Sequence, residues 1–593
     1  MRFGQVDKQQ QAIATVEKDP TIDQSVDQSV NQSAMDSIEK KTSRGEAPET
    51  IDTNPEQASP EYVQGLPLVC IIVGLTLAVF CLALDRTILA TAVPKITTEF
   101  NSLNDVAWYG SSYLLTTCCF QLMFGKLYAE FRVTWVFLAA LAFFELGTIV
   151  CAAAPNSIAL IIGRAISGIG CAGLLSGTFI IIAQSFPVHK RPIYTGMIGG
   201  MAGVAEIIAP TLGAFVPGAL TDNATWRWCF WINLPLGAIT AVVVFLFVKP
   251  PTDAEPKQPK TIGAFLNSMD PIGTVLLMPF MVCLLLALQW GGTTYAWSNW
   301  RIILCLCLFG VLFLAWLGIQ YYRGDDATLP LRLMRQRSVA SGMLFMLGVN
   351  GAVFVIVYYV SIWFQVVKDT TAEQSGINFL TSSTAVSVSS ILSGIITSKV
   401  GYWVPQMVAS TLLTSISSGL IFRYEVETTT AYWAGTLFMF GFGAGMGMQM
   451  PLAAIQTVLK GADVSLGTSS LILAQTLAGS IFLSVAQSLF QSRLLVELAA
   501  KAPQVDAQVV VGHGASGIKA MVTQKYGDAA ALDVLGAYNH SLRACFLLCI
   551  VLSCLTGIGA LGTEWRSVRE GTPKDTADDE QTASGGETPR SNM

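Results

Sequence analysis

Residues 196–231, GMIGGMAGVAEIIAPTLGAFVPGALTDNATWRWCFW, decide the fold class, because an apolar stretch of membrane length carries repeated glycines and an acid. On a helix, positions along this stretch line up on one face: Gly199, Gly203, Glu206, Pro210 and Gly213. Small residues in a stripe let a second backbone approach closely inside a bilayer. An acid at that depth costs at least ~2.5 kcal/mol. We therefore expect Glu206 to face protein or a cavity rather than lipid.

The composition predicts an all-α polytopic membrane protein. Charged residues make up 13% of the chain, against roughly 25% in ordinary globular proteins, and the mean hydropathy is +0.53. The cysteines lie in or beside apolar segments, where Cys packs as a small hydrophobe. The histidines lack neighbouring Cys or acid at metal-ligand spacing. We expect no disulfide framework, metal, cofactor or nucleic-acid partner.

Fourteen segments are long enough to cross a bilayer of about 30 Å. They are 67–90, 107–127, 133–154, 158–183, 193–217, 229–248, 271–290, 302–322, 340–364, 376–398, 403–422, 431–457, 467–489 and 541–562. Residues 1–65 are polar and repetitive, which predicts a disordered tail.

The charge pattern predicts that both tails are cytoplasmic. With an even number of spans and the tails inside, the inner loops carry more Lys and Arg than the outer loops. In this orientation Asn223 and Asn539, each in an Asn-X-Ser/Thr sequon, face outward and are candidate N-glycosylation sites.

Several motifs resemble one transporter family. Helix 193–217 resembles the antiporter motif of the major facilitator superfamily. TWRWCFWINLPLG (225–237) resembles the 14-helix drug:proton antiporter branch, especially fungal toxin-efflux pumps. Further similarity lies in LDRTILATAVPKI (84–96), GKLYAEFRVTWVF (125–137), GRAISGIGCAG (163–173), YYVSIWFQVVKDTTAEQSGI (358–377) and GAGMGMQMPLAAIQ (443–456).

The resemblance implies the domain organisation. We expect a six-helix bundle over 66–249, two inserted helices over 250–338, a second six-helix bundle over 339–562 with a long outer loop at 490–540, and a C-terminal tail over 563–593. Substrate would bind near the bilayer midplane between the bundles.

The resemblance also implies proton-driven export of amphipathic organic compounds by a monomer in the cell membrane. The vacuolar membrane is the alternative location. Asp85 is the first proton-coupling candidate, because a buried acid can bind a proton on one side and release it on the other. Arg164 needs a carboxylate or carbonyl partner when buried, so the two residues are candidates for coupling. Glu206 departs from the family pattern, which suggests a role in substrate choice or an extra proton step. Candidate cavity residues, equally compatible with helix–helix hydrogen bonds, are Gln121, Asn350, Gln365, Gln449, Gln456 and Gln475.

Other functions have weaker signals. The GIGCAG spacing at 168–173 lies inside an apolar span, so helix packing is a better interpretation than a nucleotide loop. No convincing nucleophile or cofactor loop indicates an enzyme. The alternatives are a proton-linked importer or vacuolar exchanger of basic amino acids or iron chelates, and a non-transporting nutrient sensor.

Overall fold

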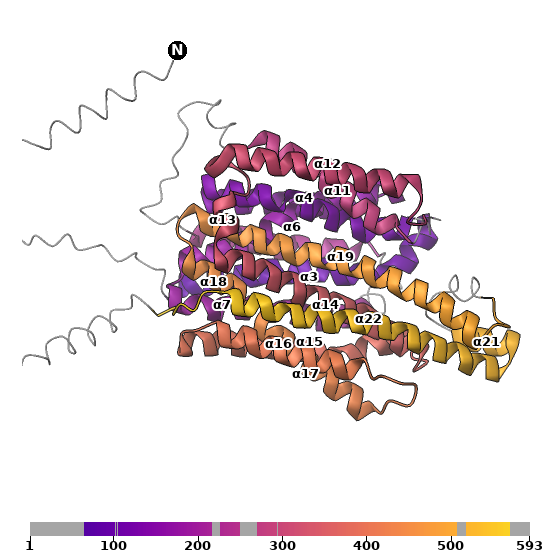
Figure 1. The fold of residues 1–593 in the computed structure, drawn as a ribbon. Helices are drawn as coiled ribbons and strands as arrows, with labels where there is room; N and C mark the ends of the chain where they lie inside the picture. Colours follow the sequence, from indigo (N-terminus) through magenta and orange to yellow (C-terminus); the bar gives the residue numbers. More distant parts are fainter. Residues whose placement is uncertain are drawn as a thin grey trace, which may run out of the picture. The chain divides into compact units, whose positions relative to one another are not determined.

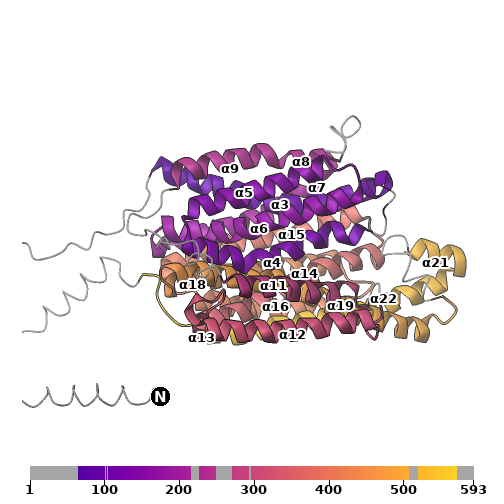
Figure 2. The same ribbon diagram turned by 90° about the horizontal axis from the view of Figure 1, so that it is seen from above.

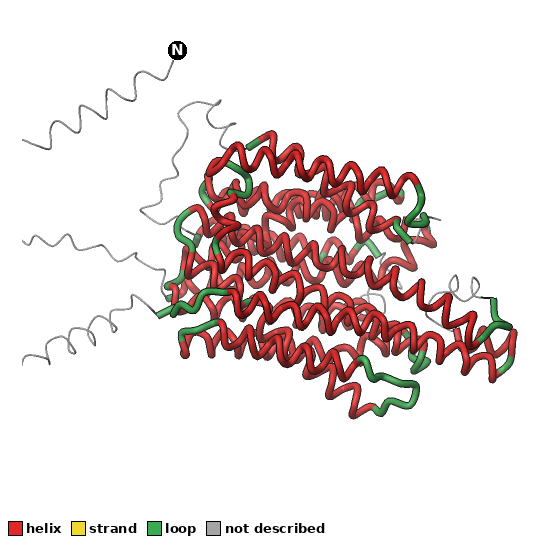
Figure 3. The backbone as a smooth tube through the Cα atoms, in the orientation of Figure 1, coloured by secondary structure: helices red, strands yellow, loops and turns green. Residues whose placement is uncertain are grey.

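The computed structural model describes residues 65–100, 102, 105–215, 226–248, 270–292, 295–506 and 518–569, which all belong to one compact unit. This part of the chain is built of helices and connecting turns and contains no β-strand (Figure 3). In a bilayer the backbone must satisfy its own hydrogen bonds, which long apolar segments achieve as helices.

The first bundle contains the helices of the first six predicted spans. They are α3 (Leu66–Phe100), α4 (Val106–Glu130), α5 (Val133–Ala152), α6 (Ser157–Ser185), α7 (Arg191–Phe215), and the short α8 (Trp228–Trp231) followed by α9 (Asn233–Phe247). α6 packs against α4 and α5, while α3 packs against α7 and α9. Asn156 begins α6, because its side-chain oxygen accepts a hydrogen bond from the Ala159 backbone N–H at 2.9 Å.

The inserted pair and the second bundle follow. The inserted helices are α11 (Pro271–Trp290) and α12 (Trp300–Arg323), and the short α13 (Leu331–Arg335) leads out of them. The second bundle has α14 (Arg337–Val366), α15 (Ala372–Val400), α16 (Val404–Ile421), α17 (Thr430–Met448) with α18 (Met450–Val458), α19 (Ala462–Lys501) and α22 (Asp528–Gly562). α11 contacts both bundles, through α4 and α19 (Figures 1 and 2).

The all-α polytopic fold is confirmed. Within the described ranges, twelve helical segments are long and apolar enough to span a membrane. α4 and α7, of 25 residues each, coincide with the other two predicted spans. Each of the fourteen predicted segments thus falls on a helix.

We expected a long loop over 490–540, but most of these residues are helical. α19 continues to Lys501, α21 (Ile518–Tyr526) follows, and α22 already begins at Asp528. Figure 1 shows these helical ends extending past the bundle. Leu494 and Leu498 on α19, Val522 on α21 and Val534 on α22 are buried in one cluster, so apolar contacts stabilise the extension.

We call the end of the bundle where α3 begins and α22 ends the terminal side, and the opposite end the distal side. The two bundles are hydrogen-bonded on the terminal side. Arg191 donates to the Gln456 carbonyl at 2.6 Å, Gln456 donates to the Phe179 carbonyl at 3.1 Å, and Ser398 donates to the His189 carbonyl at 2.6 Å. These bonds join α6 and α7 with α15 and α18.

Candidate functional site

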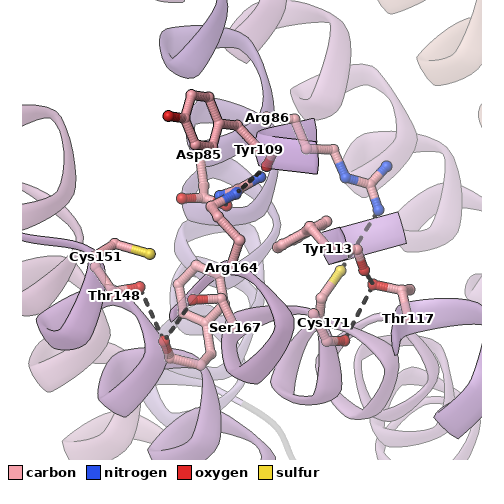
Figure 4. A network of polar contacts seen from close by, with 12 residues as sticks. Asp85, Arg86, Tyr109, Tyr113, Thr117, Thr148, Cys151, Arg164, Ser167 and Cys171 are labelled. Atoms are coloured by element: carbon pink, nitrogen blue, oxygen red, sulfur yellow. Dashed lines mark hydrogen bonds and ion pairs between the residues drawn. The ribbon is translucent and has the colours of Figure 1, made fainter. Parts of the chain in front are cut away.

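Asp85 on α3 and Arg164 on α6 form a buried ion pair. Arg164 Nη1 lies 2.6 Å from Asp85 Oδ2, and the residues are 0% and 1% exposed. Figure 4 shows the two side chains meeting between their helices. Removing one partner of such a pair leaves an uncompensated buried charge. Two of the three proton-coupling candidates from the sequence are therefore brought together.

α4 supplies the other contacts of this guanidinium. Arg164 Nε donates to the Tyr109 carbonyl at 3.0 Å, and the Tyr113 ring lies 4.4 Å from the guanidinium carbon (Figure 4). The same ring lies 5.6 Å from the guanidinium of Arg86, which donates to Cys171 Sγ at 3.5 Å. The sequence analysis missed both tyrosines. Their spacing of four residues places them on one face of α4, and this spacing could have indicated that they contact the same neighbour.

Three glycines of α7 pack against α15, and one of them, Gly203, belongs to the predicted stripe. A methyl group added at Gly196 would lie 2.5 Å from the Ser390 carbonyl, and one at Gly200 would lie 2.9 Å from the Ser387 carbonyl. One added at Gly203 would overlap the Ser387 hydroxyl. The small residues on both helices therefore permit this close approach of two backbones. The serines of α15 were not predicted, although they recur at helical spacing.

Part of the predicted stripe lies outside the described side chains. Gly199 packs against the Gln449 side chain, which links α7 to the start of α18. The structure describes no side-chain placement for Glu206 and Pro210 and no burial for Gly213. The roles assigned to these three residues stay predictions.

Most of the predicted cavity residues serve helix packing. Gln121 donates to the Ala172 carbonyl at 3.3 Å and to the Ser176 hydroxyl, which joins α4 to α6. Asn350 donates to the Met346 carbonyl of its own helix at 2.9 Å. Gln449 is buried between the bundles, and Gln475 is half-buried on α19. Gln456 is also buried between the bundles, and it lines a cavity of about 740 Å³ there, as predicted.

Gln365 lines a different cavity. This cavity has a volume of about 530 Å³ and lies towards the distal side of the second bundle. Its other lining residues are aromatic, aliphatic or uncharged polar: Phe354, Val357, Tyr358, Ser361, Ile362, Leu483, Gln487, Phe490 and Tyr538. Such a lining suits an amphipathic compound with aromatic or aliphatic surface and a few hydrogen-bonding groups.

The structure argues against Asn539 as a glycosylation site. The residue is 7% exposed, its Oδ1 accepts a hydrogen bond from Trp363 Nε1 at 3.0 Å, and its Nδ2 donates to the Tyr424 carbonyl at 3.0 Å. A glycan on Nδ2 would have no room. Asn223 lies outside the described residues and stays a prediction.

A second buried carboxylate, which the sequence analysis did not single out, anchors the inserted helices. Asp270 caps α11 by accepting the Gly273 N–H at 3.0 Å, and it also accepts from Gln320 Nε2 at 3.0 Å and from the Thr328 N–H at 3.0 Å. Arg323 Nε lies 3.2 Å from Asp270 Oδ1. Burial by itself would raise the pKa of Asp270, but the hydrogen bonds outweigh it and hold that pKa below its usual value.

The long apolar helices define a polytopic membrane protein with a buried ion pair between two of its spans. The family model of the Major Facilitator Superfamily matches residues 75–483. The chain belongs to this superfamily.

The similar proteins are fungal efflux pumps. Efflux pump aflT of Aspergillus parasiticus is 44% identical, covering 88% of this chain and 99% of that protein. MFS-type efflux pump MFS1 of Trichophyton rubrum is 46% identical, covering 86% of this chain and 93% of that protein.

Solved structures share the fold. The human organic anion transporter MFSD10 superposes with a TM-score of 0.51 at 15% identity, covering 83% of this chain and all of that one. The proton:xylose symporter XylE gives a TM-score of 0.52 at 12% identity, covering 82% and 94% of the two chains.

Proposed function

We propose that this protein is a proton-driven exporter of amphipathic organic compounds, of the kind that fungi make as toxins or secondary metabolites. The main support for proton coupling is the buried Asp85–Arg164 pair. The export direction is supported by the efflux pumps among the similar proteins.

The pair offers a simple coupling device. A proton on Asp85 neutralises the carboxylate and weakens its hold on Arg164, while release of the proton restores the ion pair. Asp85 and Arg164 lie on different helices, so protonation changes the contact between α3 and α6. Each proton that moves inward gains about 2.3 kcal/mol per 100 mV of membrane potential.

The test is transport in proteoliposomes with an imposed pH gradient, using a fluorescent amphipathic compound. Asp85→Asn keeps the side-chain volume and removes the titratable group, so gradient-driven uptake should be lost. Glu373→Gln, at an exposed position in the first turn of α15, is the matched control and should transport like the wild type. Gradient-driven transport by Asp85→Asn at equal protein levels would reject the coupling role.

We further propose that the protein works as a monomer in the cell membrane. The charge pattern of the loops supports a cytoplasmic location for both tails. Cysteine labelling in sealed cells tests this topology. A cysteine introduced near Asn223 should react without permeabilisation, and reaction only after permeabilisation would reverse the orientation.

A further inference from the structure

Glu145, in the middle of α5, is an acid whose carboxylate has no hydrogen-bond partner in the described part of the chain. Both of its oxygens are buried. Oε1 packs so closely on Gly237 of α9 that a methyl group there would overlap it. An ionised carboxylate inside a membrane without a donor or a cation is very costly, whereas a protonated carboxyl is tolerated.

Among the described residues, none supplies an unpaired positive charge beside Glu145. The titratable groups within electrostatic reach are Asp85 and Cys81 on α3. Arg164, on the adjoining α6, is paired with Asp85. α9, the helix that Glu145 packs against, has no titratable residue between Asn233 and Phe247. Asp85 thus has a cation partner in this conformation and Glu145 has none, so Glu145 is the acid on which a proton relieves the larger cost of burial.

An independent observation lies on α9. Asn233 is 0% exposed, and neither its amide oxygen nor its amide nitrogen has a partner among the described residues. It precedes Gly237 by one helical turn and so lies on the face of α9 that Glu145 contacts. Asp85 Oδ1 is likewise buried without a partner. Buried polar atoms without a hydrogen-bond partner among the described residues therefore lie on α3, α5 and α9.

We propose that Glu145 is a second proton-carrying residue, which accepts the proton that Asp85 releases. The O–H bond on Asp85 breaks and an O–H bond on Glu145 forms, and the Asp85 carboxylate then binds Arg164. The amide of Asn233, which can both donate and accept, is assigned the role of a positioning group because it lies one turn before Gly237 on α9 and has no other partner among the described residues. The inference rests on the proposed proton coupling.

Infrared spectroscopy of the purified protein at neutral pH tests the protonation state without transport. The wild type should show a protonated-carboxyl band that Glu145→Gln lacks and that Asp85→Asn and Glu373→Gln keep. If Glu145→Gln fails to fold, Glu145→Asp should keep the band at a shifted position. Absence of the band from the wild type, or its persistence in Glu145→Gln, overturns the proposal.

Transport tests the coupling. In proteoliposomes Glu145→Gln should move fewer protons per substrate than the wild type and show a weaker pH dependence of the rate, while Glu145→Asp should restore part of both. If Glu145→Gln keeps the pH profile and the proton-to-substrate ratio of the wild type, Glu145 is not a second proton carrier. The proposed function would still stand. Transport by the wild type without any proton movement would instead reject the proposed function, whatever the infrared result.

Discussion

At the residue scale, a buried charge is stable here only with a specific partner. Asp85 and Arg164 satisfy each other, and the Tyr109 carbonyl satisfies a further N–H of the guanidinium. The Tyr113 ring covers its face. Because the contacts of Arg164 come from α3 and α4, the pair couples the charge of one carboxyl group to the packing of α3, α4 and α6.

Arg164→Leu should destabilise the protein by ~3–5 kcal/mol, because it leaves the Asp85 charge buried and unpaired. The double variant Arg164→Leu/Asp85→Asn should regain most of this loss, since it removes both charges. Thermal unfolding in detergent measures both effects. Equal melting temperatures for the single and double variants would show that the pair does not hold an ionised Asp85.

At the element scale, close approach depends on which glycines face another backbone. Gly196 lies against the Ser390 carbonyl of α15, whereas nothing lies within 4 Å of a methyl group added at Gly419 on α16. The same substitution therefore has opposite expected effects at the two sites.

Gly196→Ala should cost ~1–3 kcal/mol of stability and lower the transport rate, because the added methyl group forces α7 and α15 apart. Gly419→Ala should be neutral or stabilising by up to about 1 kcal/mol, since alanine is the better helix former. Thermal unfolding and transport of the two purified variants decide this. If Gly196→Ala changes neither the melting temperature nor the transport rate, the α7–α15 contact tolerates separation.

Asp270 gives the inserted helices a pH-dependent anchor. Its pKa is lowered in the folded protein, so its contribution to stability is complete above the unfolded pKa of about 3.9 and is lost as the pH falls through the folded value. Asp270→Asn should therefore be less stable at neutral pH and should lose less stability on acidification than the wild type. Unfolding temperatures from pH 7 downward check this, and parallel curves would contradict it.

At the scale of the whole molecule, the segment after α12 links the two bundles on the terminal side. Arg332 on α13 pairs with Asp463 at the start of α19 at 2.8 Å and with Asp325 at 2.9 Å. Lys126 of α4 donates to the Asp326 carbonyl at 3.3 Å. A terminal-side cavity of about 740 Å³ lies between residues of both bundles, including Arg132 and Lys460.

Arg332→Ala should raise the population of conformations that are open on the terminal side, because it removes a link to the second bundle. The pairs are exposed and each contributes at most about 1 kcal/mol, so a shift of up to about five-fold is expected. Spin labels at positions 132 and 460 would report longer distances. Arg332→Lys keeps the charge and should shift less, and identical distance distributions in all three proteins would exclude the link.

Much of the fold could be predicted from the sequence. Fourteen apolar segments became helices because a backbone in lipid must bond to itself, whatever its neighbours. The pairing of Asp85 with Arg164 could also be anticipated, since neither charge is stable in a membrane alone.

Only the tertiary structure decided what the polar side chains do. Gln121 binds a carbonyl of a neighbouring helix, Gln365 lines a cavity, and Gln456 does both, and their sequence contexts do not distinguish these roles. Glu145 was noticeable as an acid in a span, but its lack of a partner depends on α9 packing against it. Helix formation is a local consequence of composition, while burial, pairing and protonation depend on which helices become neighbours.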